Sequence, residues 1–357
     1  MLKGLRFYSI LLCCFWLSTT QAQTNSKAAK HLYDQAVELL ASNNNTKSTL
    51  ESIALLESAI NKDTNFVLAY QVLFQLNLDL KKFETAIKVY EKANQLDSNT
   101  FFPYIVKYAS AYASIGQYEK ANTILNSLFA QATVPGYLKA SALSLQKNCA
   151  FALSQTTAND ISVTNAGDSI NTNAAEYFPT VTVQDSLFVF MRRDNWKRED
   201  FYTSTIVPNG FTKAQPLLDS LNIADKKGSP SLSADLQTLY YAADYASSGY
   251  GRYDIYKVTK SKTGWSLPKN LGRNINTDFW ESAPSISPDG QALYFCSNMP
   301  GGYGGIDIYV SFKNEKGFWE EAINLGPTIN TAGDEQTPYI HADNRSLYFA
   351  SNGWPGY

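Results

Sequence analysis

Few side chains in this sequence could perform catalysis or bind a metal. The chain of 357 residues has only two histidines, His31 and His341, and His341 stands where other copies of a repeat described below carry Ser233 and Ser287. That makes it a variable repeat position rather than a base. No Gly-x-Ser-x-Gly, His-Glu-x-x-His or P-loop pattern is present. We therefore predict no catalytic residue, no cofactor and no metal site, in a protein that is not an enzyme.

The cysteines and two recurring aspartates are better explained by structure than by chemistry. Cys296 is matched by Ala242 and Ala350 in the sister repeats, which predicts a small residue on a packed strand rather than a nucleophile. Asp254 and Asp307 each precede a strand-like segment. We interpret both carboxylates as acceptors for the backbone of their own repeat, the alternative being cation ligands.

Charge and composition narrow the class of protein. Thirty basic residues against 32 acidic ones give a net charge of −2, which leaves no positive excess for binding phosphates, so nucleic-acid binding is not expected. With 44% hydrophobic and 17% charged residues, the chain can form packed cores. Its length suggests about two domains.

The N-terminus predicts export. Lys3 and Arg6 precede an apolar run over residues 7–17, and Ala22 follows as a small residue suited to a signal peptidase. The run is too short to span a bilayer, so we predict a cleaved signal peptide over residues 1–22. No later segment is apolar enough to form a transmembrane helix.

A lipid anchor is the alternative at this end. Cys13 and Cys14 could mark a lipoprotein signal, although Leu11 and Leu12 stand where small residues are wanted. Cleavage after Ala22 would leave only Cys149 and Cys296, which lie in different halves of the chain, so we expect no disulfide within a domain.

Residues 24–153 show a helical pattern with a repeat. Apolar residues recur at three- and four-residue spacing, while Ala59 and Ala93 lie 34 residues apart and Ala86 and Ala121 lie 35 apart. The best copy carries Ala69, Tyr70, Leu73, Leu76, Phe83, Ala86, Tyr90, Ala93 and Asp97. This segment resembles tetratricopeptide (TPR) proteins, whose repeat is a helix pair of about 34 residues. A plain helical bundle is the alternative. A linker rich in Ser, Thr, Asn and Gly follows over residues 154–173.

Residues 170–357 repeat with a longer, strand-like unit. Four prolines are spaced by 51, 54 and 54 residues: Pro179, Pro230, Pro284 and Pro338. Nine residues before each stands an aliphatic residue followed by Asn: Ile170-Asn171, Leu221-Asn222, Ile275-Asn276 and Ile329-Asn330. After each of the last three comes a turn at Asp235, Asp289-Gly290 or Asp343, and then Leu-Tyr-aromatic. Four short strands in about 54 residues are the size of one propeller blade.

The strings Ser-Pro-Asp-Gly-x-x-Leu-Tyr-Phe (287–295) and Gly-Gly-x-Asp-Ile-Tyr (304–309) resemble the WD40-like blades of TolB-type propellers. The order of signal peptide, TPR and WD40-like propeller resembles the N-terminal part of OmpA-family envelope proteins of Bacteroidetes type, including accessory proteins of type IX secretion and gliding. That resemblance implies a C-terminal OmpA-like domain that holds peptidoglycan. Here this domain is absent, and three full units and a partial fourth lead us to expect a truncated chain.

The sequence thus predicts an α + β multidomain chain, with an N-terminal TPR α-solenoid and an incomplete WD40-like β-propeller. The aromatic residues Tyr250, Tyr303, Trp354 and Tyr357 lie in turns of successive repeats, where they could form a binding surface. The alternative is that these rings pack against the neighbouring blade.

The functional expectation is a non-enzymatic scaffold of the cell envelope. Its partners would be envelope proteins or peptides, with a possible peptidoglycan link, and its location the periplasm or the periplasmic face of the outer membrane. A glycan-binding propeller, or the gating domain of a propeller-containing hydrolase, are the alternatives.

Overall fold

The computed structural model describes residues 24–42, 45–155, 163–182, 184, 186–194, 198–217, 226–245, 247–262 and 264–356. The predicted signal peptide with Cys13 and Cys14, the repeat residues Leu221 and Asn222, and Tyr357 lie outside the described residues. The chain forms two compact units, one of helices and one of β-sheets. In the described segments, no helix combines the length and the apolar character needed to cross a membrane.

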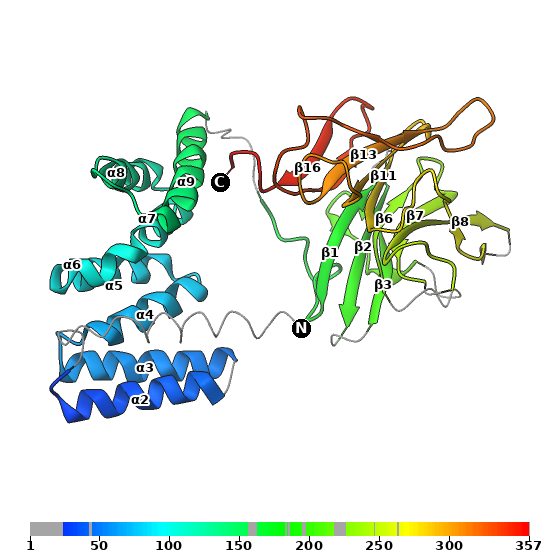
Figure 1. Cartoon of the computed structure of the whole chain (residues 1–357). Coiled ribbons are helices and arrows are strands. Elements are labelled where there is room, and N and C mark those ends of the chain that lie inside the picture. The colour runs from blue at the N-terminus through cyan, green and yellow to red at the C-terminus, as the bar shows by residue number, and fades with distance from the viewer. Residues whose placement is uncertain are drawn as a thin grey trace. The chain divides into compact units, whose positions relative to one another are not determined.

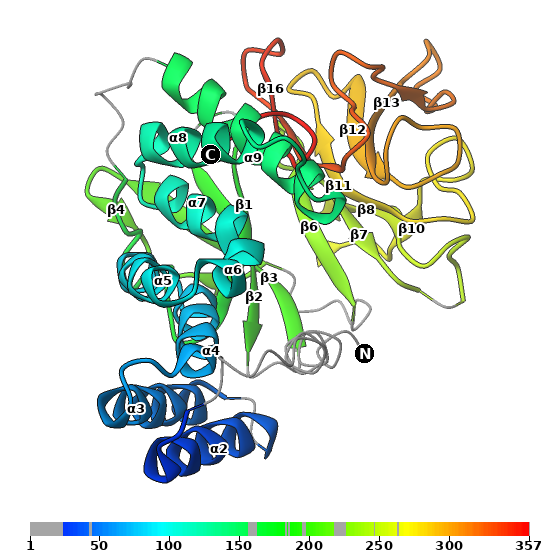
Figure 2. The same ribbon diagram turned by 60° about the vertical axis from the view of Figure 1, so that its left-hand side comes forward.

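The helical unit consists of successive hairpins of helices joined by short turns (Figures 1 and 2). Its elements are α2 (Lys27–Ser42), α3 (Thr46–Lys62), α4 (Val67–Asp79), α5 (Phe83–Leu96), α6 (Ser98–Phe101), η1 (Phe102–Tyr104), α7 (Ile105–Ser114), α8 (Tyr118–Phe129) and α9 (Gly136–Ser154). Contacting pairs are α2 with α3, α4 with α5, and α7 with α8. The predicted helical regime is therefore confirmed, whereas its assignment to the TPR class stays a prediction.

Two equivalent turns set the period of these pairs. Lys81 and Gly116, 35 residues apart, both have a positive φ, of 56° and 76°. In each turn the next residue donates its backbone N–H to a carbonyl five residues back, Lys82 to Asn77 and Gln117 to Tyr112. This closure ends a helix and reverses the chain, and it suits Gly116 better than Lys81 because glycine has no Cβ.

The helix pairs pack small residues against large ones. Ala69, Ala86 and Ala93 are fully buried, and the rings of Phe74 and Tyr90 fill the space beside them with centroids 5.5 Å apart. Small side chains let neighbouring helices approach closely while the aromatic rings supply the buried area.

The second unit consists of four antiparallel sheets in chain order. Blade 1 contains β1 (Ala175–Val181), β2 (Leu187–Asp194), β3 (Arg198–Val207), β4 (Gly210–Phe211) and β5 (Gln215–Pro216). Blade 2 contains β6 (Lys227–Leu232), β7 (Thr238–Ala243), β8 (Asp254–Ser261), β9 (Gly264–Trp265) and β10 (Lys269–Asn270). Blade 3 contains β11 (Glu281–Ile286), β12 (Ala292–Ser297), β13 (Asp307–Phe312) and β14 (Ile323–Asn324), and the blade 4 hairpin contains β15 (Glu335–Ile340) and β16 (Leu347–Ser351).

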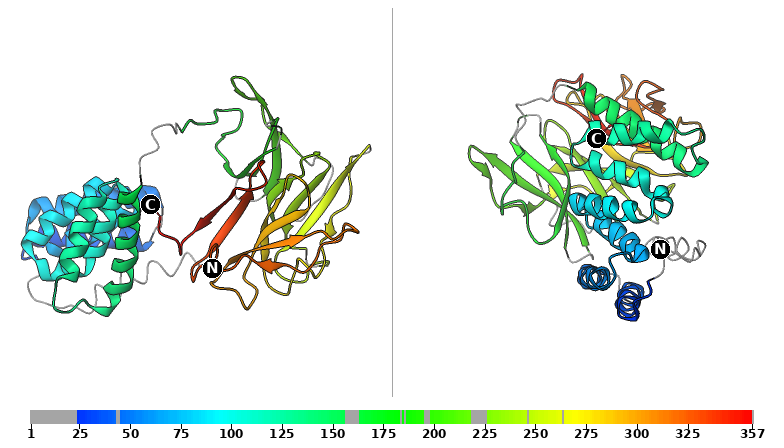
Figure 3. Two further views of the ribbon diagram at one scale, coloured as in Figure 1. Left: turned by 90° about the horizontal axis from the view of Figure 1, so that it is seen from above. Right: turned by 90° about the vertical axis from the view of Figure 1, so that its left-hand side faces the viewer.

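The first strands of the blades lie side by side. β6 contacts β1, β11 contacts β6, and β15 contacts β11. Between the sheets, apolar clusters centre on Tyr241, then on Phe295, and then on Cys296. Figure 3 (left) shows the sheets following one another from green through yellow and orange to red. This arrangement is a partial β-propeller, which confirms the coarse prediction for this half.

Candidate functional site

The same backbone distortion occurs in the first strand of all four blades. Phe178, Ser229, Ala283 and Thr337 each precede one of the repeated prolines and have φ between 50° and 52°. At each position the pairing with the second strand shifts register, as it does in a β-bulge. A left-handed conformation costs a residue with a Cβ roughly 1–2 kcal/mol. Four repetitions of this cost indicate that the bulge has a role.

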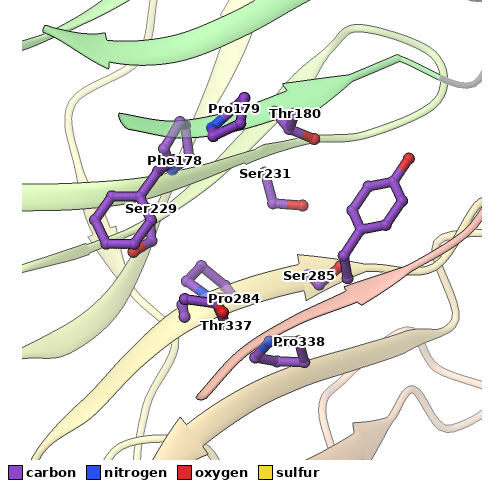
Figure 4. A pocket seen from close by; sticks show the side chains of 12 residues that line it. Phe178, Pro179, Thr180, Ser229, Ser231, Pro284, Ser285, Thr337 and Pro338 are labelled. Carbon is purple, nitrogen blue, oxygen red and sulfur yellow. The ribbon is translucent and has the colours of Figure 1, made fainter. Parts of the chain in front are cut away.

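The four bulges surround one pocket of about 280 Å³ (Figure 4). Three residues from each first strand line it: Phe178, Pro179, Thr180, Ser229, Pro230, Ser231, Ala283, Pro284, Ser285, Thr337, Pro338 and Tyr339. The sequence showed the prolines only as markers of a repeat, since spacing alone does not reveal that a bulge turns them toward a common space.

The lining offers apolar rings and hydroxyl groups but no charge. It contains no Asp, Glu, Lys, Arg, His or Cys. The hydroxyl oxygens of Ser231 and Ser285 accept the backbone N–H groups of Ile286 and Ile340, both at 3.0 Å, and so connect each blade to the next. A serine that accepts one bond can still donate its own proton. The pocket can therefore bind an uncharged group with hydrogen-bond acceptors and an apolar surface.

The aromatic loops are fixed by the recurring aspartates. Asp254 accepts the backbone N–H groups of Tyr250 at 2.7 Å and Gly251 at 3.1 Å. Asp307 does the same for Tyr303 at 2.5 Å and Gly304 at 3.0 Å. This confirms our interpretation that both carboxylates serve the backbone of their own repeat.

The rings of these loops are partly exposed. Tyr250 is 41% exposed with the Arg273 guanidinium 4.1 Å from its ring centroid, Tyr303 is 51% exposed, and Trp354 is 43% exposed. The Trp354 indole donates to the Ile329 carbonyl at 2.7 Å. Among the described residues, no ring contact joins these three side chains, so the structure does not bring them into one cluster. Their role in binding stays a prediction.

Two glycines of these loops allow close contact between blades. A Cβ added to Gly251 would lie 1.9 Å from the Phe279 carbonyl oxygen, and one added to Gly304 would lie 1.9 Å from that of Gly333. The loops therefore serve as spacers between blades as well as carriers of the aromatic rings.

Buried polar residues, whose role sequence reasoning missed, hold the blades together. The Asn276 side chain accepts the Ile255 N–H at 2.7 Å and donates to the Ile255 carbonyl at 3.0 Å, and Asn330 does the same with Ile308. These are the asparagines of the aliphatic-Asn motif. Their fixed spacing was visible in the sequence, but their partners were not.

A carboxylate at the start of β11 has a similar structural role. Glu281 is fully buried and accepts bonds from the Thr277 backbone, the Thr277 hydroxyl and the Ser297 hydroxyl. Burial raises its pKa above the ordinary range of a glutamate. In blade 2 the same position holds Lys227, which instead forms a 2.9 Å ion pair with Asp200 of blade 1.

The other reactive side chains lie outside the pocket. His31 is exposed on α2, and His341 lies in the turn after β15, where its Nδ1 accepts the Asp343 N–H. Cys296 is fully buried, and burial raises its pKa to about 12, so little thiolate exists at neutral pH. Within the described segments, no group of three or more metal-binding side chains is present.

The comparisons with known proteins give weak likenesses only. No family model matches the chain, and neither does any curated protein. A TolB protein from Agrobacterium tumefaciens is 16% identical, with a TM-score of 0.34 over 48% of this chain and 52% of that one. A puromycin-hydrolyzing peptidase from Mycobacterium tuberculosis is 12% identical, with a TM-score of 0.33 over 50% of this chain and 25% of that one.

The type III secretion translocator chaperone SycD from Yersinia enterocolitica is 15% identical, with a TM-score of 0.30 over 37% of this chain and 98% of that one. The chain thus spans about half the length of the TolB protein and a quarter of the peptidase. The sheet order and the contacts between elements of this chain themselves define its helix pairs and its partial β-propeller.

Proposed function

We propose that this chain is a non-enzymatic interaction protein of the cell envelope. In this proposal the blades bind a segment of a partner protein in the pocket of Figure 4, and the helix pairs, as a TPR solenoid, bind a second partner. The sequence resemblance to OmpA-family envelope proteins supports a location in the periplasm or on the periplasmic face of the outer membrane. It also supports a peptidoglycan link through a further domain.

The observation that carries the proposal is the chemistry of the pocket lining. Prolines and hydroxyls from four successive blades surround it, and the lining has no imidazole or carboxylate that could activate those hydroxyls. An extended peptide segment matches such a lining, because its carbonyls accept from hydroxyls while its side chains contact the prolyl rings.

Photo-crosslinking from inside the pocket tests the proposal. Phe178 lines the pocket and is 37% exposed, so replacing it with benzoylphenylalanine keeps an aromatic residue there. We expect a discrete adduct with an envelope protein. The same replacement at Phe318, which is 68% exposed and outside the lining, is the control. No adduct from position 178, or the same adduct from position 318, would refute binding in the pocket.

Export is tested separately. A mature protein that begins at Gln23 and fractionates with the envelope supports the proposed location, whereas an intact N-terminus in the cytoplasmic fraction contradicts it.

Glycan binding is the second candidate, and the exposed rings of Tyr303 and Trp354 favour it. Aromatic rings on turns can stack against sugars. Quenching or enhancement of tryptophan fluorescence by envelope glycans, and its loss in Trp354→Ala, would support this reading over peptide binding.

A further inference from the structure

Three lysines gather where the outer strands of blade 2 face blade 3. Lys257 on β8 is directly opposite Lys269 on β10. Lys257 is also opposite Tyr240 on β7, whose ring packs edge-on against Trp319 of blade 3. Lys313 of blade 3 places its ammonium group 4.8 Å from the same Trp319 ring. Since residues opposite each other in a sheet share a face, all three lysines border the space between the two blades.

The pairing of Lys257 with Lys269 destabilises the sheet. Like charges directly opposite each other on neighbouring strands repel. Lys257 is half-buried, and its pKa is lowered by burial and then by the charges of Lys269 and Lys313. At the equivalent position blade 3 has the apolar pair Val310 and Ile323. The fold therefore accepts an apolar pair here and does not require two lysines.

The charges of Lys257 and Lys269 have no counterion in the described part of the chain. Neither residue forms an ion pair or a side-chain hydrogen bond there. Burial lowers the pKa of Lys313, and the negative charges of Asp235 and Asp289 oppose that shift. The ammonium group of Lys313 also donates to the Gly290 carbonyl at 2.7 Å. The positive charge of Lys313 is thus partly compensated, whereas the charges of Lys257 and Lys269 are not.

We propose that Lys257 and Lys269, assisted by Lys313, form a binding site for a phosphate group between blades 2 and 3. A phosphate dianion balances two ammonium charges and has several oxygens to accept their N–H groups, whereas a carboxylate supplies one charge. The site is separate from the uncharged pocket and does not depend on the proposed function.

Titration of the full chain with inorganic phosphate, at constant ionic strength set by sodium chloride, tests the proposal. We expect saturable binding by calorimetry and a higher melting temperature. The double variant Lys257→Val, Lys269→Ile copies the blade 3 pair. It should bind phosphate at least about tenfold more weakly, because charge-assisted bonds are lost, and should melt higher than the wild type without phosphate.

Matched measurements separate this site from nonspecific attraction. Lys316→Ala removes an exposed lysine from the turn before β14 and should leave phosphate binding unchanged. Lys269→Gln is a milder variant should the double variant fail to fold, and it should also weaken binding. Glycerol 3-phosphate should bind if the natural ligand is a phosphate ester, and only inorganic phosphate should bind if it is the free ion. No saturable binding, equal binding by the double variant, or glucuronate binding as tightly as phosphate would overturn the proposal.

Discussion

The helical unit and the blades are both repetitive, but different kinds of residue recur in them. In the helix pairs, the positions that repeat are filled by buried alanines such as Ala86 and Ala121. In the blades, buried polar residues also repeat, as Asn276 with Asn330 and Asp254 with Asp307 show. The residues that recur in the helix pairs thus serve close packing, whereas those that recur in the blades also form hydrogen bonds.

The reason lies in how the backbone N–H and C=O groups of the helices and of the blades find hydrogen-bond partners. A helix pairs its own N–H and C=O groups, so only its ends need partners. Blades are joined by loops, and the third strands of blades 2 and 3 have backbone groups that bond to side chains of the loop leading to the next blade. Asn276 accepts the N–H of Ile255 and donates to its C=O, which also accepts the Leu271 N–H. A buried backbone group without a partner is costly, which explains why a polar side chain recurs in that place.

The largest effect is expected from a substitution that leaves a cavity in the core of the helical unit. Phe74 is fully buried beside Tyr90 and Tyr104. Phe74→Ala should lower the free energy of unfolding of the helical unit by about 3–5 kcal/mol, through lost burial and a cavity. Chemical denaturation followed by circular dichroism at 222 nm measures it. Tyr137→Ala, at a 67% exposed position of α9, is the control and should change it by less than about 0.5 kcal/mol. Equal losses in the two variants would contradict a core held by packing.

The corresponding change in the blades removes hydrogen bonds rather than volume. Asn276→Ala leaves the N–H of Ile255 without its acceptor, while the C=O of Ile255 keeps the N–H of Leu271 as a donor, and it should cost about 1–3 kcal/mol. The amide of Ile255 should then exchange its hydrogen faster, while amides of α4 and α5 should not change. The exposed Asn209, in the turn between β3 and β4, offers Asn209→Ala as the control. Uniformly faster exchange across both units would mean that the asparagine does not act locally.

The contrast also explains what the sequence revealed in advance. Helix pairs, the turn at Gly116 and the hairpin turn at Asp289-Gly290 could be predicted, because each follows from local periodicity or turn chemistry. The sequence also predicts a structural role for Asp254, from its position before a strand. These features depend on residues close together in the chain.

The pocket could not be predicted, because it depends on contacts between repeats. Nothing in the residue type of Ala283 signals a φ of 51°, and the bulge arises where β11 pairs with β12. In the same way, Lys257 and Lys269 lie opposite each other because of the strand register, which the spacing of the two residues in the sequence does not determine.

A smaller effect is expected from the serine hydroxyls that accept a backbone N–H of the next blade. Ser285→Ala removes the acceptor of the Ile340 N–H and should cost about 1 kcal/mol. Ser229→Ala is the matched control, since Ser229 lines the same pocket and its hydroxyl forms no hydrogen bond with any described residue. Thermal melting of both variants measures the difference. Equal losses would show that the hydroxyls contribute through the pocket surface and not through the link to β15.

The smallest effect is a pH dependence that both units share. The Ser287 hydroxyl and the Gln291 N–H hold the pKa of Asp289 below its usual value, and Thr100 does the same for Asp97 in the helical unit. A carboxyl group with a lower pKa in the folded state stabilises the fold above its unfolded pKa, near 3.9, and this gain disappears as the pH falls through the folded value. Asp289→Asn should therefore flatten the acid side of the stability curve of the blades below about pH 4, and leave that of the helices unchanged. Asp97→Asn should do the reverse. Denaturant titrations at several pH values distinguish the two, with tryptophan fluorescence reporting on the blades, because every tryptophan after residue 22 lies beyond residue 170, and circular dichroism at 222 nm reporting on the helices. If either variant flattened both curves, the two units would not unfold independently. The packing of the helix pairs and the hydrogen bonds of the blades would then have to be compared as parts of one cooperative structure.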